Sequence, residues 1–281
     1  MTNHLIAMSD GSDFSWRAVR LAARIATSID LPLEVVEVAL LPADVPLTKR
    51  SIEDRLADEL GSDLASTTAT TVLVQGDRIA STIADYITSI GDGSIAVMSS
   101  AGRGRSAALL GSVAEDLLSQ LHGPVLLVGP EVDVESFHLD GRILVPVDGS
   151  STSEYALGLA AAWGIEHGSV PWVVNVVDPE ELARMGDGMG GGDVSESSYA
   201  SRTAQLLREQ SHHSVNYDVL HDRHPDRAIA RYATSGDVSL IVASTHGRTG
   251  LARVAAGSQA MGMVHRSPVP VLLVRPPSVD T

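Results

Sequence analysis

Residues 239–276, SLIVASTHGRTGLARVAAGSQAMGMVHRSPVPVLLVRP, carry the pattern on which the fold of this chain depends. The apolar run Leu240–Ala243 breaks at a Ser/Thr/Gly-rich stretch that cannot continue a strand. A second break at Gly257 and Ser258 opens QAMGMVHRS, in which apolar residues recur at helical spacing until Pro268 ends the element. The stretch therefore predicts a strand, a glycine-containing loop, a short helix and a second strand.

The corner between this loop and the helix is a candidate anion site. Backbone N–H groups at a helix N-terminus carry roughly half a positive charge, and glycine allows a phosphate to approach without a Cβ in the way. Glycines near a helix start also occur in simple turns, so this feature alone leaves both interpretations open.

The chain contains the same unit twice, which is the next strongest signal. HLIAMSDGS at 4–12 corresponds to RILVPVDGS at 142–150, at an offset of 138 residues (148 minus 10) that holds through the next helix and strand. In the second copy, Ser151 and Glu154 form a candidate capping box at the start of that helix.

Each copy continues with a third strand, a helix, a fourth strand and a near-identical last strand, PVLLVGP at 124–130 or PVLLVRP at 270–276. Strands that alternate with helices predict a parallel, doubly wound α/β sheet. We expect two domains, residues 1–132 and 140–281, with a linker from Glu131 to Gly141.

Composition restricts the classes of function. A length of 281 residues suits two domains, and no apolar stretch approaches the roughly 18 residues that span a bilayer. The net charge of −15 disfavours nucleic acid and anionic lipid, and the absence of cysteine excludes disulfides and thiol chemistry. The N-terminus lacks a signal-peptide pattern, so we expect a cytoplasmic protein that binds neither nucleic acid nor membrane. Lys49 is the only lysine, which fits a GC-rich genome or a salt-adapted host equally well.

The glycine spacing resembles the G-x2-G-x9-G-[S/T] signature of the nucleotide-binding members of the universal stress protein family. Gly247 is followed by nine residues and then by Gly257 and Ser258, while Ser244 replaces the first glycine of the signature. The resemblance covers nearly the whole chain as two tandem copies. It implies two Rossmann-like domains, each a five-stranded parallel sheet of order 3-2-1-4-5 flanked by helices, and it implies ATP as the ligand, with or without Mg²⁺.

The same resemblance assigns ligand contacts in the second copy to the ends of strands one, two and four and to the glycine loop. Each of these positions also has an ordinary structural interpretation: Asp148 suits a helix start, and Val176 suits a buried strand position. Arg248 and Arg253 could neutralise phosphate charge or simply lie solvated in an exposed loop. The residues expected to contact the nucleotide are Pro146, Asp148, Val176, Ala243, Ser244, Gly247, Gly257, Ser258 and Gln259.

The first copy matches the signature less well. Only eight residues separate Gly102 from Gly111, and Met8 replaces the proline of the first strand. One missing residue shifts a loop by up to about 3.5 Å, which exceeds the tolerance of a hydrogen bond. We therefore expect weak or no nucleotide binding at this first site, whose matching residues are Asp10, Val38, Gly102, Gly111 and Ser112.

Motifs for catalysis are not evident in the sequence. There is no P-loop, no G-x-S-x-G nucleophile elbow, and no set of ligands that would complete a metal site with the histidines at 212, 213, 221 and 224. We expect no catalytic residues and no metal ligands. The main hypothesis is an ATP-binding stress or signalling module; the alternatives are a slow ATP-hydrolysing enzyme on the same pocket and a scaffold that has lost nucleotide binding.

The second copy also contains ARMGDGMGGGDVSES, which is too rich in Gly, Asp and Ser to pack well. We expect a mobile loop at residues 183–198. Its role is open between a lid over the nucleotide and a tolerated insertion.

The last strand of each copy is an uncharged edge strand in the order 3-2-1-4-5, and such edges favour pairing. The resemblance implies antiparallel pairing of Val125–Val128 with Val271–Val274. The eleven-residue linker spans about 35 Å when extended, which is enough for this arrangement. We expect an intramolecular pseudo-dimer of the two domains and further association of two chains into a homodimer.

Overall fold

The computed structural model describes residues 3–60, 67–73, 78–91, 93–101, 111–186, 192–245 and 257–276. Gly102, Gly247, Arg248 and Arg253 lie outside these residues. The chain forms two compact units, divided between Phe137 and His138.

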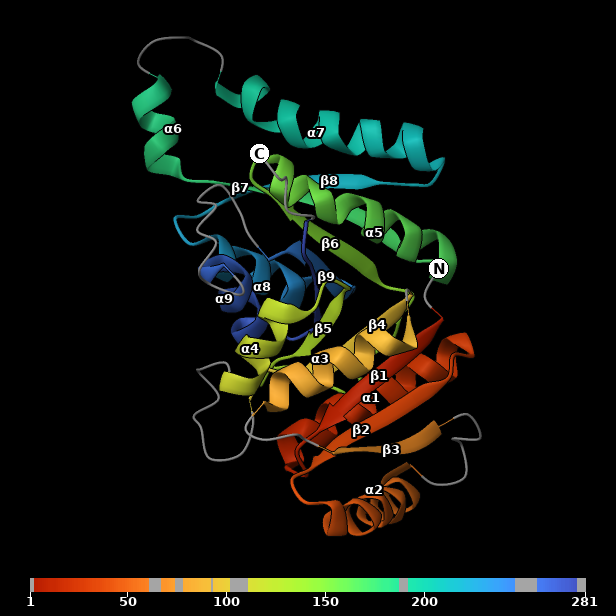
Figure 1. Ribbon diagram of the computed structural model, residues 1–281. Helices are drawn as coiled ribbons and strands as arrows, with labels where there is room; N and C mark the ends of the chain where they lie inside the picture. Colours follow the sequence, from red (N-terminus) through yellow and green to blue (C-terminus); the bar gives the residue numbers. More distant parts are fainter. Residues whose placement is uncertain are drawn as a thin grey trace. The chain divides into compact units, whose positions relative to one another are not determined.

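In the first unit, five described strands form a parallel sheet in the order β3-β2-β1-β4-β5 (Figure 1). The strands are β1 (His4–Ser9), β2 (Leu33–Ala39), β3 (Thr67–Leu73), β4 (Ser94–Ser99) and β5 (Val125–Val128). The helices are α1 (Asp13–Ile29), the short 3₁₀ helix η1 (Pro42–Asp44), α2 (Val45–Leu60), α3 (Ile79–Ile90) and α4 (Ser112–Gln120).

The second unit repeats this arrangement, with strand order β8-β7-β6-β9-β10. Its strands are β6 (Arg142–Val147), β7 (Val170–Val177), β8 (Asn216–His221), β9 (Val238–Ser244) and β10 (Val271–Val274). Its helices are α5 (Ser151–His167), α6 (Pro179–Gly186), α7 (Gly192–Ser211), α8 (Pro225–Ser235) and α9 (Ser258–Arg266). Both units have the order 3-2-1-4-5 and confirm the predicted fold class.

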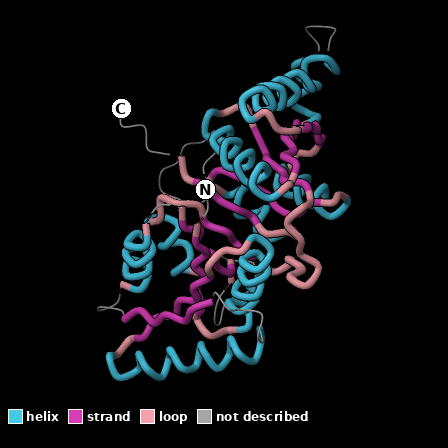
Figure 2. The backbone as a smooth tube through the Cα atoms, turned by 90° about the vertical axis from the view of Figure 1, so that its right-hand side faces the viewer, coloured by secondary structure: helices cyan, strands magenta, loops and turns pink. Residues whose placement is uncertain are grey.

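The strand registers show how closely the two copies agree. Leu5 lies opposite Leu33 in the first sheet, and Ile143 lies opposite Pro171 in the second, so both partners are displaced by the same 138 residues (143 minus 5 and 171 minus 33). The inner strands are apolar on both sides because strands alternate with helices along the chain and helices flank the strands of each unit (Figure 2). The core of each unit therefore lies along these strands.

Two regions differ from the predictions. The loop expected at 183–198 is mostly helical: α6 extends to Gly186 and α7 begins at Gly192, and only residues 187–191 fall outside the described part of the chain. Acidic residues in the first turn favour α6, and α7 is held on β7 and β8 by side chains such as Ala200 and Ala204, which are fully buried. Tertiary packing thus overrides the weak local helix signal.

The linker is also not fully extended, because its first half packs against α1. The Arg17 guanidinium on α1 donates to the carbonyl oxygen of Val132, and Arg24 donates to that of Glu135 at 2.9 Å. Val132 and Val134 are buried in the same unit. The reach of the linker is consequently shorter than its eleven residues would allow.

Candidate functional site

The second unit contains a cavity of about 300 Å³ at the carboxyl ends of β6, β7 and β9. The chain crosses over between β6 and β9, and this point of a doubly wound sheet is where ligands usually bind. The structure brings together eight of the nine residues expected from the sequence, and Gly247 lies outside the described residues. The eight that line the cavity are Pro146, Asp148, Val176, Ala243, Ser244, Gly257, Ser258 and Gln259.

Asp148 has a structural role as well as a place in the cavity. Its Oδ1 accepts hydrogen bonds from the amide of Ser150 at 3.0 Å and from the Ser150 hydroxyl at 2.6 Å. Gly149 completes the turn with a φ of +84°, a conformation that glycine adopts without strain. Asp148 is therefore both a turn residue and part of the cavity wall.

Helix α5 begins one residue earlier than the predicted capping box. The N-cap is Ser150, whose hydroxyl accepts from the Ser153 amide at 3.1 Å, so the assignment of Ser151 and Glu154 to a capping box is wrong. Glu154 instead accepts a hydrogen bond at 2.8 Å from the hydroxyl of Tyr199 on α7. Burial and this carboxylate raise the pKa of Tyr199 to about 12, so its hydroxyl remains a donor at neutral pH.

Ser153 is a cavity residue that the sequence interpretation missed. Its hydroxyl accepts from the Asp148 amide at 3.2 Å and donates to the Ser150 carbonyl at 2.9 Å, which locks the turn to the helix. The signal for it is the spacing D-G-S-x-x-S, which the first copy repeats with Ser15.

The N-terminus of α9 forms the polar end of the cavity. The Gly257 amide donates to the carbonyl oxygen of Thr245, and the Met261 amide makes the first bond to the helix, to the Gly257 carbonyl at 3.0 Å. The amides of Ser258, Gln259 and Ala260 come before that bond, so they have no partner within the helix. The donors that α9 offers to an anion are thus these three amides, and Gly257 serves close packing, because a Cβ there would lie 3.1 Å from the Thr245 carbonyl oxygen.

The side chain of Gln259 ties two helices together beside the cavity. Its Oε1 accepts from the Asp226 amide, at the start of α8, at 3.2 Å. The Asp226 carboxylate, which also lines the cavity, accepts from Arg266 Nε at 2.9 Å. The negative charge of Asp226 is therefore compensated by a neighbouring guanidinium.

The inner end of the cavity is apolar, with Val174, Val176, Ile229, Ala243 and Met263 among its lining residues. The buried Ser244 hydroxyl oxygen lies among them and has no hydrogen-bond partner within the described part of the chain. A buried hydroxyl without a partner costs free energy, so this atom is a candidate contact for a polar ligand atom.

The first unit has a corresponding cavity of about 280 Å³. Of the residues expected there, Asp10, Val38, Gly111 and Ser112 line it. The turn is the same, since Asp10 Oδ1 accepts from the Ser12 amide at 2.9 Å, but Asp10 is exposed whereas Asp148 is half-buried.

Two carboxylates distinguish the surroundings of the first cavity from those of the second. Glu37 stands where the second copy has Asn175, and it accepts a hydrogen bond from the hydroxyl of Ser9, a cavity residue, at 3.3 Å. Glu115 lies in the first turn of α4, whereas the first turn of α9 contains no acidic residue. Both differences make the first cavity less favourable for an anion.

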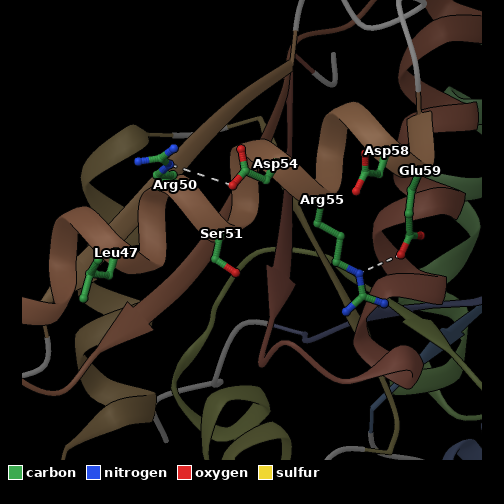
Figure 3. A pocket seen from close by; sticks show the side chains of 7 residues that line it. All are labelled: Leu47, Arg50, Ser51, Asp54, Arg55, Asp58 and Glu59. Carbon is green, nitrogen blue, oxygen red and sulfur yellow. Dashed lines mark hydrogen bonds and ion pairs between the residues drawn. The ribbon is translucent and has the colours of Figure 1, made fainter.

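A wider hollow of about 550 Å³ lies along α2 (Figure 3). Its charged side chains are largely paired with one another: Arg55 Nε donates to Glu59 at 2.6 Å, and Arg50 lies 4.0 Å from Asp54. Arg55 also donates to the Gly11 carbonyl at 3.0 Å. We interpret this surface as a support for the turn that contains Asp10.

Among the described residues, no group of three or more His, Asp or Glu side chains is placed to hold a metal ion. Within the same residues, no helix is long and apolar enough to cross a membrane.

The fold and the two cavities define a class: a tandem pair of Rossmann-like α/β domains, each with a cavity at the switch point of its sheet. The model of the Universal stress protein family matches residues 1–129 and 141–275. The chain therefore belongs to the universal stress protein family as a tandem two-domain member.

Two relatives from Mycobacterium tuberculosis are similar in sequence. Universal stress protein Rv2005c is 29% identical over 183 residues, which cover 64% of this chain and only 61% of that protein's length. Universal stress protein Rv2623 is 27% identical over 289 residues, which cover 96% of each chain.

The crystal structure of a universal stress protein from Archaeoglobus fulgidus DSM 4304 has the same tandem fold. It covers 98% of this chain and 99% of its own, with a TM-score of 0.67 and 19% identity. At this identity the likeness supports the fold alone.

Proposed function

We propose that the second domain binds ATP and that the protein acts as a nucleotide-responsive stress or signalling module. The observation that carries this proposal is the cavity at the switch point of the second sheet, which combines an apolar slot, a buried unpartnered hydroxyl among the described residues and an open helix N-terminus. These features match, in order, a base, a ribose or base heteroatom, and a chain of phosphates.

In this proposal the base lies against Val176 and Ala243, within hydrogen-bonding reach of Ser244. The phosphates accept hydrogen bonds from the amides of Ser258 and Gln259, which have no partner within the helix and lie where the helix dipole favours negative charge. Mg²⁺ would enter with the nucleotide, and the Ser258 hydroxyl is the side chain in this corner suited to contact it.

We propose that the first domain binds nucleotide weakly or not at all. Glu37 and Glu115 add negative charge near its cavity, and the corresponding positions of the second copy, Asn175 and Met261, are neutral. At an effective dielectric constant near 20, one like charge at about 8 Å costs on the order of 2 kcal/mol before screening by salt.

ATP in this site would act as a regulator of conformation or partner choice, and its hydrolysis would be slow. The Asp148 Oδ1 is engaged in a turn, and Asp226 is paired with Arg266, so neither carboxylate is arranged as a general base. We expect turnover well below about 1 s⁻¹. A faster rate in a purified sample would favour an enzyme.

We also propose an intramolecular pseudo-dimer and, through association of two chains, a homodimer. Within their own units β5 and β10 are the last strands of their sheets, and each carries only apolar residues. Such strands present N–H and C=O groups along their outer edge. Pairing of Val125–Val128 with Val271–Val274 would satisfy these groups.

The first test extracts small molecules from freshly purified protein and determines their masses by mass spectrometry. The second is calorimetric titration with ATP in the presence and absence of Mg²⁺. Co-purified adenine nucleotide, or saturable binding of added ATP, is expected. A protein that carries no nucleotide and binds none on titration is a scaffold, which would refute the proposal.

A further inference from the structure

The first cavity has nearly the same volume as the second but a different lining. Met8 stands where the second copy has Pro146, and Met98 stands where it has Ala243. Both methionines are at least nine-tenths buried. The first cavity is therefore lined by flexible thioether side chains at two positions where the second has small or rigid ones.

The polar residues on the helices of the second cavity are also replaced. Val113 lines the first cavity at the position of Gln259, and Ile79 lines it at the position of Pro225. Asp226 has Ala80 as its counterpart. Among the described helical residues that line the first cavity, Ser15 and Ser112 remain polar, and Gln259 and Asp226, whose side chains help to tie α8 to α9 in the second unit, have apolar counterparts.

One polar atom inside the first cavity is left without a partner. Ser100 is 1% exposed and lines the cavity, and its hydroxyl oxygen makes no hydrogen bond to any residue that the structure describes. Its counterpart Thr245 does have an interaction partner. A buried, unpartnered hydroxyl costs roughly 1–3 kcal/mol, so a ligand that supplies one donor or acceptor here would be stabilised and oriented.

The charges around this cavity disfavour anions. Glu37 accepts a hydrogen bond from Ser9 in the cavity wall, and Glu115 occupies the first turn of α4, where a phosphate would otherwise meet the helix dipole. An apolar interior with an acidic surround is unsuited to ATP and suited to an uncharged molecule.

We propose that the first cavity is a separate binding site for an uncharged, largely apolar small molecule that makes one hydrogen bond with the Ser100 hydroxyl. A dry apolar cavity of about 150 Å³ holds benzene, so a cavity of about 280 Å³ accommodates a ligand near the size of a two-ring aromatic. The two methionines adapt their shape to such a ligand. The two tandem domains would then respond to different ligands, a nucleotide in the second and an apolar molecule in the first.

The test uses the full-length chain and the neutral two-ring fluorescent probe 1-naphthylamine. We expect its fluorescence to rise and saturate at one probe per chain, and we expect ATP at millimolar concentration not to displace it. Val38 and Val176 line the two cavities at corresponding positions and provide matched variants. Val38→Trp should weaken probe binding at least tenfold and leave ATP binding unchanged. Val176→Trp should weaken ATP binding at least tenfold and leave probe binding unchanged.

Competitive displacement of the probe by ATP, probe binding that Val38→Trp leaves intact, or the absence of saturable probe binding would each overturn the proposal. Val113→Asp gives a second reading if Val38→Trp fails to fold, because Val113 is 39% exposed at the helix start and tolerates a polar residue. It should weaken the probe at least tenfold, and Gln259→Asp in the second domain should leave the probe unaffected. Unchanged probe affinity in Val113→Asp counts against the site. The probe-binding outcomes do not depend on whether the second domain binds ATP.

Discussion

Replacement of Gly257 by valine should remove most of the ATP affinity of the chain. Gly257 has φ −59° and ψ 151°, which valine can adopt, so the backbone itself is not strained by the change. A Cβ at this position would lie 3.1 Å from the Thr245 carbonyl oxygen, a contact that forces a shift of a few tenths of an ångström. In the proposed complex, the added methyl groups would then crowd the corner where the amides of Ser258 and Gln259 meet the phosphates.

The size of the effect follows from these two amides. A hydrogen bond to a charged acceptor contributes about 1.5–3 kcal/mol, so the loss of two bonds costs about 3–6 kcal/mol. This corresponds to a Kd that is weaker by roughly 10²–10⁴-fold. Gly111 is the matched control, since a Cβ there has nothing within 4 Å and since we propose that the first cavity disfavours nucleotide.

Isothermal titration calorimetry of Gly257→Val, Gly111→Val and the unmodified chain measures this difference, and thermal unfolding in the absence of ATP shows that each variant is folded. Gly111→Val should retain the affinity and stoichiometry of the unmodified chain. Equal losses in the two variants would refute the reasoning, because they would mean that both glycine corners hold phosphate.

Three further predictions concern charge, assembly and pH. Met261→Glu places a carboxylate like that of Glu115 in the first turn of α9 and should weaken the affinity for ATP severalfold, consistent with about 0.3–1 kcal/mol for a charge at a helix end. Met261→Gln is the neutral control. Equal affinities of the two variants in calorimetry would argue against the electrostatic account. Val125→Pro and Val271→Pro together should separate the two domains without breaking the hydrogen-bond ladders within each unit. The reason is that the bonds to β4 and β9 use the alternate residues of β5 and β10. A small-angle scattering profile that stays compact would exclude strand pairing as the contact between the domains. Burial lowers the pKa of His167 in the folded state, so the unfolded chain takes up this proton first and stability should fall as the pH drops below about 6.5. The urea midpoint of His167→Phe should fall less steeply with pH than that of the unmodified chain. An equally steep fall would assign the pH dependence to other groups.

The fold could be predicted because its signals are local and occur twice. The constant offset between the copies shows that Leu5 and Ile143 occupy the same place in their sheets, and the apolar runs flanked by glycine and proline locate the strands. Helix α7 could not be predicted in this way. It is held by the burial of Ala200 and Ala204 against β7 and β8, and its first residues are poor helix formers.

The residues that line the candidate site could be predicted from the sequence, but most of the hydrogen bonds between them could not. The sequence places Asp148 and Ser258 at one edge of the sheet, but it does not show that the Gly257 amide donates to Thr245 or that Ser150 caps α5. Contacts from distant elements, such as the hydrogen bond from Tyr199 to Glu154, depend on packing between helices that local patterns do not encode. The hydroxyls of Ser100 and Ser244, which have no hydrogen-bond partner among the described residues, could not be predicted either, because their state depends on burial.

The central claim is that one chain binds one ATP, in its second domain. Native mass spectrometry of the full-length chain, first stripped of nucleotide and then titrated with ATP and Mg²⁺, tests this most directly. We predict that one nucleotide adds per chain, that Gly111→Val leaves this adduct unchanged, and that Gly257→Val abolishes it. A chain that takes up two nucleotides, or none, at saturating ATP would contradict the account.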